Sequence, residues 1–346
     1  MKRLIFIFVL VGLLVQPVFA LGADIPEVSG EGAAYMPKES GSFWNDLLLI
    51  LKNALRTLKP EIAGFAKTCL SIISTVFLIS LIRSIDQLGT KVPILIGSTV
   101  IGILVLNSAN TMIDVGITTV NEMTDYGKLI LPVMTATLAA QGRTGTSTAL
   151  YTGTVIFSSV LTTLIARLLL PMLKLYLCCA IANSATQEGI LKRMTAFCKW
   201  TYTWGLKIIL YIFMGYMTIS GVISGTVDAT ATKAAKLTIS GTVPVVGGIL
   251  ADASETILLS AGLMKNAAGT YGLLAFAAIL IGPFIKIGVR YILVKITAAV
   301  SEVFGVSELS GLINDYSSGM GFLLGMIGSV CLMLMVSLVC FLKGST

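Results

Sequence analysis

The stretch YSSGMGFLLGMIGSVCLMLMVSLVCFL, residues 316–342, carries no charged side chain. About 20 apolar residues in a helix cross the roughly 30 Å hydrocarbon core of a bilayer, so this stretch is long enough to span a membrane. Similar charge-free windows lie at residues 92–113, 144–166, 208–227 and 266–285, and residues 65–82 form another if Lys67 extends its amine to the membrane surface. The pattern predicts an all-α, polytopic membrane protein with six to eight spans.

The overall composition agrees with a membrane protein. Apolar residues make up 55% of the chain and charged residues 12%, and the mean hydropathy of +0.93 lies well outside the range of soluble proteins. The formal net charge of +7 reflects an excess of Lys and Arg, which typically marks the cytoplasmic loops of such proteins. Because no basic run with interleaved aromatic residues occurs, the sequence does not predict a nucleic-acid partner.

The chain begins like a secreted protein. Lys2 and Arg3 precede the apolar run LIFIFVLVGLLV, and the residues VFA that follow suit cleavage by signal peptidase. We expect a signal peptide at residues 1–20, with an uncleaved first span as the alternative. Residues 21–41 are polar, contain Gly and Pro, and are expected to form an exposed lead outside the cytoplasm.

An amphipathic helix is predicted directly after this lead, from the sequence SFWNDLLLILKNALRTLK at residues 42–59. Its apolar residues recur at helical spacing, while most of its charged residues lie off that stripe. The stripe consists of Trp44, Leu47, Leu48, Leu51, Leu55 and Leu58. The helix is expected on the outer membrane face or against a partner, or else packed on the chain's own helical bundle.

The charged loops predict the orientation in the membrane. Basic residues bracket one short loop at residues 83–91 and cluster in another at residues 192–199, so both loops are expected in the cytoplasm. The acidic segment at residues 114–125 then faces outward. Residues 168–186 and 287–305 are not expected to cross the membrane on their own, and the second carries a polar stripe typical of an interfacial helix.

An internal repeat is predicted at an offset of 112 residues, which aligns Pro132 with Pro244 and Lys174 with Lys286. Parallel duplication of this kind is a known architecture of transporters and channels. The predicted segments are 1–20, the signal peptide; 21–59, the extracytoplasmic lead and amphipathic helix; 60–91, the first span and its cytoplasmic loop; 92–191 and 192–305, the two membrane repeats; and 306–346, the C-terminal span.

Each repeat contains an apolar stretch that is interrupted by helix-disrupting residues. Pro132 interrupts the first stretch, and Pro244 with the pair Gly247 and Gly248 interrupts the second. Unpaired backbone groups cannot face lipid, so both stretches are predicted to be re-entrant or broken helices that line a pathway or are buried in protein.

Charged residues accompany these interruptions. Asp252 and Glu255 lie three residues apart, on one face of a helix, and the repeat offset aligns Arg143 with Glu255. Arg143 and Glu255 form a charge pair between the repeats in one interpretation. In the other, all three groups are wetted at the outer surface of the membrane.

The sequence lacks the residues that most catalytic and metal-binding sites require. The chain contains no His, which excludes His-based metal sites, HExxH proteolysis and serine triads with a His base. Its six Cys residues lie in or beside apolar segments without CxxC spacing, as expected of packing residues. The sequence GRTGTS lacks the Lys of a phosphate-binding loop. We therefore expect no enzymatic activity, no cofactor and no metal.

The residues VPVVGGILADASETILLSAGLMKNAAGTYG, with LILPVMTATLAAQG before them and IGPFIKI after them, resemble the stage III sporulation protein AE family. The resemblance implies a multi-pass protein of the mother-cell membrane that surrounds the forespore in an endospore-forming bacterium. It also implies a channel or secretion-like complex with other stage III sporulation A-operon proteins and, directly or through them, stage II sporulation protein Q. It implies no catalytic residue.

Two functions remain open at this point. One is a conduit-forming subunit of that transenvelope complex, required for late forespore development. The other is a self-sufficient permease for a small solute, which the paired interruptions suggest. An intramembrane enzyme has almost no support in the sequence, and the resemblance favours the conduit subunit.

Overall fold

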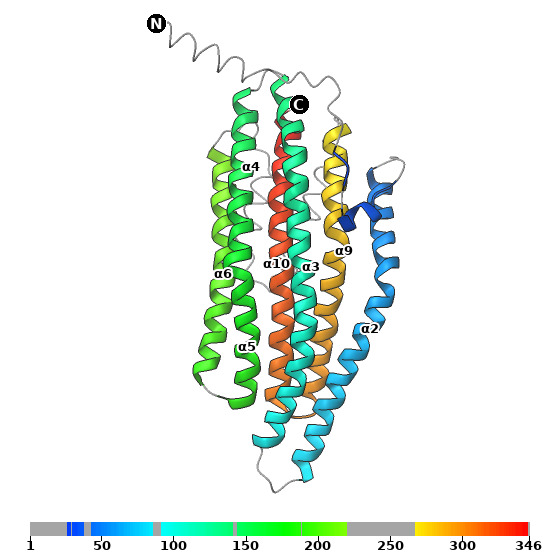
Figure 1. Cartoon of the computed structure of the whole chain (residues 1–346), viewed down its shortest axis with the longest axis vertical. Coiled ribbons are helices and arrows are strands. Elements are labelled where there is room, and N and C mark those ends of the chain that lie inside the picture. The colour runs from blue at the N-terminus through cyan, green and yellow to red at the C-terminus, as the bar shows by residue number, and fades with distance from the viewer. Residues whose placement is uncertain are drawn as a thin grey trace.

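The computed structural model describes residues 26–28, 30–37, 43–85, 91–140, 144–187, 189–219 and 267–344, which form one elongated bundle of long helices (Figure 1). The main helices are α2 (Phe43–Ile85), α3 (Lys91–Ala140), α4 (Thr144–Leu164), α5 (Leu170–Thr186), α6 (Gly189–Ile219), α9 (Ala267–Glu302) and α10 (Ser307–Gly344). A short 3-10 helix, η1 (Gly30–Ala34), precedes them, and a π-helical turn, η2 (Ile165–Leu169), joins α4 to α5. The described residues contain no strand, which confirms the all-α prediction.

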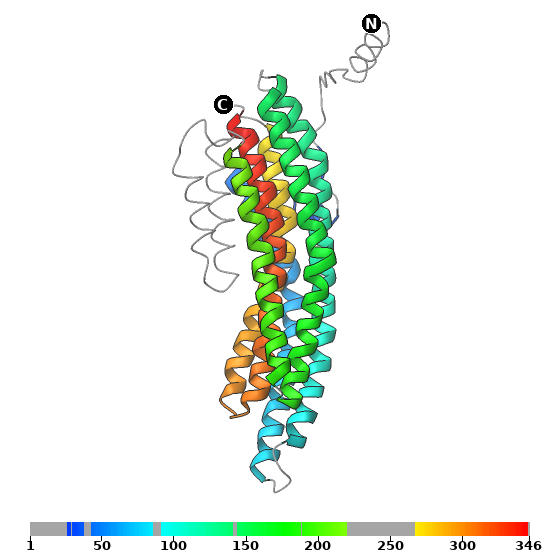
Figure 2. The same ribbon diagram turned by 90° about the vertical axis from the view of Figure 1, so that its left-hand side faces the viewer.

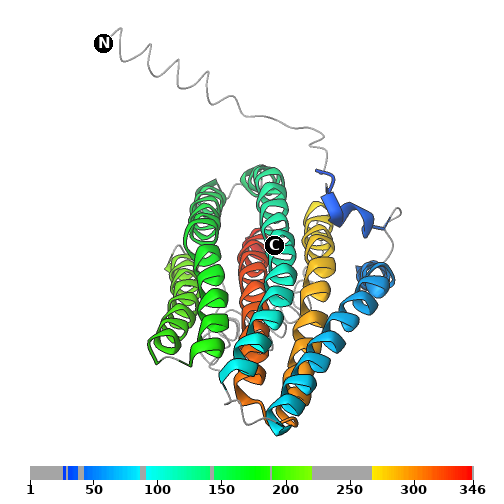
Figure 3. The same cartoon turned by 60° about the horizontal axis from the view of Figure 1, so that its bottom comes forward.

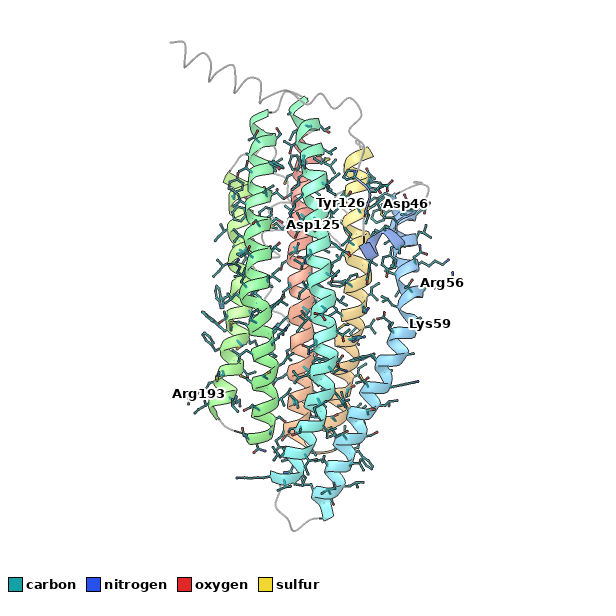
Figure 4. All side chains as sticks on the ribbon, viewed as in Figure 1. Asp46, Arg56, Lys59, Asp125, Tyr126 and Arg193 are labelled. Carbon is teal, nitrogen blue, oxygen red and sulfur yellow. The ribbon has the colours of Figure 1, made fainter. Side chains whose placement is uncertain are left out.

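The helices alternate in direction along the bundle. The chain passes from α2 to α3, from α5 to α6 and from α9 to α10 at one end, which we call the lower end after its place in Figure 1. The opposite, upper end holds the last residues of α3, α6 and α10 and the first residues of α4 and α9. Arg83, Lys91 and Lys192 therefore lie toward the lower end, as does Arg193 in Figure 4. The two basic loops share one end, as the predicted orientation requires.

Helix α10 forms the centre of the bundle. It packs against α3, α4, α5, α6 and α9, and Figure 3 shows α3 and α10 between a group made of α4, α5 and α6 and a group made of α2 and α9. In the most apolar window of α10, 83% of the residues are buried, against 28% in α2. A helix that is apolar on every side must be enclosed by protein or by lipid. Protein encloses α10, whereas the outer side of α2 depends on lipid.

The helices are much longer than a bilayer core is thick. At 1.5 Å per residue, the 43 residues of α2 extend over about 65 Å and the 50 residues of α3 over about 75 Å. Figure 2 shows how long and narrow the bundle is. Five described stretches are long and apolar enough to cross a membrane: Phe43–Ser84, Lys91–Ala139, Gly145–Thr186, Gly269–Glu302 and Ser307–Leu342.

The predicted break at Pro132 is wrong, because α3 continues through this residue to Ala140. A proline inside a membrane helix is tolerated where packing and nearby hydroxyl groups compensate for its missing backbone donor. The carbonyl that loses its donor is that of Lys128, four residues before Pro132, while Ile130, Met134 and Leu138 around it are buried in the bundle. Packing of this part of α3 into the bundle therefore prevails over the local signal.

Residues 168–186 and 287–305, which were not expected to cross the membrane on their own, also differ from the prediction. Residues 287–302 continue α9 past Pro283, and Ile287 and Val294 in them are fully buried, so they do not form an interfacial helix. Helix α5 continues the line of α4 through the π-helical turn and reaches the lower end. The polar stripe on α9 instead faces α2, with Lys286 beside Glu61.

The described part of the N-terminal lead is partly packed against the bundle and partly exposed. Val28 and Tyr35 are buried, and η1 lies against α9. Gly32 permits this contact, because a Cβ at that position would lie 2.8 Å from Ile279 Cγ1 and 3.0 Å from Ile279 Cα. Burial raises the pKa of the Tyr35 hydroxyl, and the carboxylates of Glu31 and Glu61 raise it further. This phenol therefore remains neutral at physiological pH.

The first part of α2 packs on the chain's own bundle, one of the alternatives considered for the amphipathic helix. The buried side chains are Phe43, Asp46, Ile50, Ala54 and Leu58. Most of the predicted apolar stripe faces away from the bundle, with Trp44, Leu48, Leu51 and Leu55 exposed. Figure 4 shows Arg56 and Lys59 on the outer side of this helix. The helix thus has an inner apolar face against α9 and an outer face that combines apolar and basic groups.

Candidate functional site: a polar face on α3

One side of α3 carries an unbroken row of polar side chains. Every exposed residue between positions 107 and 128 is polar. Apart from Asn110, which is next to Thr111, these residues follow one another at alternating spacings of four and three, so they lie on one face of the helix. This polar face consists of Asn107, Asn110, Thr111, Asp114, Thr118, Asn121, Asp125 and Lys128. It extends over about 32 Å at the helical rise of 1.5 Å per residue.

The same helix changes character sharply below the polar face. Nearer the lower end, its exposed residues are mainly apolar and include Val92, Leu95, Ile96, Val100 and Ile103. Ile103 is 64% exposed, and the next exposed residue along the chain is Asn107. Polar and ionisable side chains are rare on lipid-facing helix surfaces because their transfer into hydrocarbon is costly. The apolar part can therefore face lipid, whereas the polar face requires water or a polar partner.

The opposite side of α3 holds the polar face in place. Apolar residues at helical spacing, among them Met112, Val120 and Met123, are buried against neighbouring helices. Gly127 lies against α10, because a Cβ at this position would lie 3.1 Å from Leu334 Cδ2. Thr124 links α3 to α4 through a hydroxyl contact of 3.2 Å with Thr162. This packing fixes the rotation of α3, so the polar residues can point only outward.

The charges of the polar face are mostly in contact with solvent. Lys128 Nζ lies 2.7 Å from Asp125 Oδ1, but both side chains are about two-thirds exposed, at 67% and 68%. Exposed pairs of this kind contribute little to stability. Figure 4 places Asp125 in the upper part of α3. Beside the face, the carboxylate of Glu122 accepts a hydrogen bond of 3.4 Å from the backbone N–H of Glu31.

A buried polar network lies at the lower limit of the polar face. Ser108, next to Asn107, accepts a hydrogen bond from Arg290 Nη1 at 3.3 Å and lies 2.8 Å from the hydroxyl of Tyr316. The Arg290 guanidinium also lies over the ring of Phe65, 4.8 Å from its centroid. The network connects α2, α3, α9 and α10 at one level of the bundle. We use this level as the boundary between a lower half and an upper half.

The predicted site residues in the described part of the chain are not brought together. Lys286 forms an ion pair with Glu61 on α2 in which Nζ is 3.0 Å from both carboxylate oxygens, whereas Lys174 is exposed on α5. The two lysines that the repeat aligns therefore have different surroundings. Pro132 lies on the outer side of α3. The other candidates lie outside the described residues: Arg143, Pro244, Gly247, Gly248, Asp252 and Glu255.

The chain is similar to a known protein family and to a protein of Bacillus subtilis. The family model described as stage III sporulation protein AE matches residues 35–344. The chain belongs to the stage III sporulation protein AE family. It is also 25% identical over 273 residues to the stage III sporulation protein AE of Bacillus subtilis (strain 168), which covers 77% of this chain and 68% of that protein. No solved structure matches the chain.

Family membership assigns the protein to sporulation. The geometry identifies the polar face of α3 as the candidate functional site. Within the described ranges, no group of three or more His, Cys, Asp or Glu side chains could hold a metal ion. The sequence-based reasoning missed the polar face because it treated residues 114–125 only as an outward-facing acidic segment. The alternating three- and four-residue spacing of Asn, Thr and Asp would have revealed a helical face.

Proposed function

We propose that this protein is a membrane-embedded subunit of a conduit or secretion-like complex that joins the mother cell and the forespore and supports late forespore development. In this proposal it lies in the mother-cell membrane around the forespore. Its partners are other stage III sporulation A-operon proteins and, directly or through them, stage II sporulation protein Q. The observation that carries the proposal is the polar face of α3, which is as long as a bilayer core is thick but unsuited to lipid.

The exposed side chains suggest where the bilayer lies. In the lower half, α2 and α3 expose large apolar residues, among them Leu70, Phe77, Leu78, Leu95 and Ile103. Above this level, the exposed residues of α3 from 107 to 128 are polar, and α2 carries Arg56 and Lys59. We infer that the lower parts of α2 and α3 face the bilayer and that the polar face of α3 does not face lipid.

The basic residues favour the lower end as the cytoplasmic end. Arg83, Lys91, Lys192 and Arg193 lie toward that end, and such residues are enriched on the cytoplasmic side of membrane proteins. The polar face of α3 then lies on the side of the protein toward the forespore. It thereby offers a surface to partner proteins.

The permease alternative has lost one of its two supports. It was suggested by a pair of broken segments, but α3 is continuous at Pro132. The second segment, at residues 241–266, lies outside the described residues. A transporter site between matched broken helices therefore has no support from the first copy, and the conduit subunit remains the better proposal.

A reconstituted flux assay tests the proposal against a permease. Liposomes that contain the purified full-length protein alone are expected to retain small fluorescent solutes. Liposomes that contain it together with other operon products are expected to release them, because the polar face can enclose a water path only with partners. Release that requires no partner would favour the permease. Retention in both cases, after confirmed assembly, would contradict the conduit.

A further inference from the structure

A groove between α2 and α9 carries an excess of positive charge. Its lining includes Leu58, Glu61 and Ile62 of α2 and Lys286, Arg290 and Leu293 of α9. Lys286 is paired with Glu61, with its side chain only 16% exposed. Arg290 has no ion pair with a carboxylate among the described residues. The groove thus holds two cations against one anion.

Arg290 is suited to bind a further anion. A guanidinium has five N–H donors, and the described contacts of Arg290 use one of them, toward Ser108. The contact with the Phe65 ring occupies a face of the guanidinium plane and leaves the other donors at its edge. Arginine binds phosphate oxygens through such paired donors, and Lys286, one helical turn away, adds a second positive charge.

The size of the groove indicates how a ligand would sit in it. Its cavity volume is about 10 Å³, which is room for roughly one water molecule. The accessible wall of the cavity is apolar, so a phosphate can approach Lys286 and Arg290 only at the mouth of the groove, with the rest of the ligand outside. Ile292 and Ile296, both 55% exposed, continue from the groove along α9 toward the lower end, followed by Val300. Lys295 is exposed on the same face, where its amine donates to Asn314. A ligand with one phosphate and long apolar chains matches this surface.

We propose that the groove binds the phosphate of an anionic phospholipid whose acyl chains lie along Ile292, Ile296 and Val300. The inference rests on the bilayer placement proposed above, in which the lower parts of α2 and α3 face lipid; the groove lies at the upper limit of these parts, which corresponds to the level of the lipid head groups. The excess cation attracts the phosphate, and the apolar row on α9 selects a lipid over a free anion.

Binding of phosphatidylglycerol to the purified full-length protein in a neutral detergent tests this site. Lys286→Gln and Arg290→Gln are each expected to weaken binding by about tenfold, which corresponds to the loss of a charge-assisted hydrogen bond. Glu61→Gln is expected to strengthen binding, because it removes the carboxylate that competes for Lys286. Lys174→Gln, which removes an exposed lysine on α5, serves as the matched control and is expected to leave affinity unchanged.

Affinity is expected to fall in Lys286→Gln and Arg290→Gln but to rise in Glu61→Gln. This contrast distinguishes a binding site from a folding defect, because a misfolded variant does not gain affinity. Weaker or unchanged binding by Glu61→Gln would overturn the proposal, as would an equal loss in Lys174→Gln. Equal affinity for phosphatidylcholine, or full competition by inorganic phosphate, would also overturn the choice of an anionic lipid. An error in the conduit proposal would show in the flux assay but would leave this binding in detergent unchanged.

Discussion

Simultaneous replacement of Asp114, Thr118 and Asn121 by leucine is expected to abolish most of the protein's role in sporulation while leaving it folded in the membrane. All three side chains are exposed on the polar face, so leucine creates no clash with the bundle. Hydrophobic constrictions block ions and polar solutes by excluding water. Leucine also removes the polar groups that a hydrophilic partner would contact.

The effect is best measured as the yield of heat-resistant spores in a strain whose own gene is replaced by the variant. We expect this yield to fall by about tenfold or more, as for a water path closed by an apolar constriction. The matched control is Thr152→Leu with Ser159→Leu and Thr163→Leu, which changes three exposed hydroxyls on one side of α4. The control is expected to sporulate normally. Equal yields for both triple variants, at equal protein levels, would refute a role of the polar face.

The substitution Ala278→Leu is expected to cause the largest loss of stability from a small change. Ala275 and Ala278 are fully buried, and all residues of α9 from 272 to 280 are buried, because α9 is enclosed by η1, α2, α3 and α10. Added methyl groups in a filled core force side chains and backbone apart and typically cost about 1–3 kcal/mol.

Thermal unfolding of the purified protein in detergent measures this loss. Ala299→Leu is the matched control, since it makes the same change on the same helix at an exposed position. We expect a clear decrease in Tm for Ala278→Leu and little change for Ala299→Leu. If both variants unfold at the temperature of the parent, α9 is not enclosed on all sides as described.

Local patterns in the sequence predicted where the helices lie along the chain better than they predicted which helices are in contact. Charge-free windows identified the apolar parts of α2, α3, α4, α9 and α10, because the cost of burying charge in hydrocarbon acts along the chain itself. The basic loops predicted correctly that two distant connections share one end. Proline was misleading at position 132, where packing of α3 in the bundle outweighs the lost backbone donor.

Links between distant residues could not be predicted from one sequence. Ser80 Oγ donates to the carbonyl of Phe304 at 2.8 Å, and Arg83 Nη1 lies 3.6 Å from Glu308 Oε2. Tyr176 donates to Asp315 at 3.0 Å. No spacing rule connects these positions, because their proximity depends on how the helices assemble. The polar face of α3 was different, since its helical period was present in the sequence and was overlooked.

The exposure of the polar face to water is the central claim, and cysteine labelling along α3 tests it most directly. Thr118→Cys and Ile103→Cys lie on exposed positions of the same helix. Each is introduced into a variant without the six native Cys residues, of which Cys178 is exposed. The protein is then treated in liposomes, on both sides, with a charged thiol reagent that does not enter lipid. We predict rapid labelling at position 118 and none at position 103. Labelling at 103 with none at 118 would contradict the account.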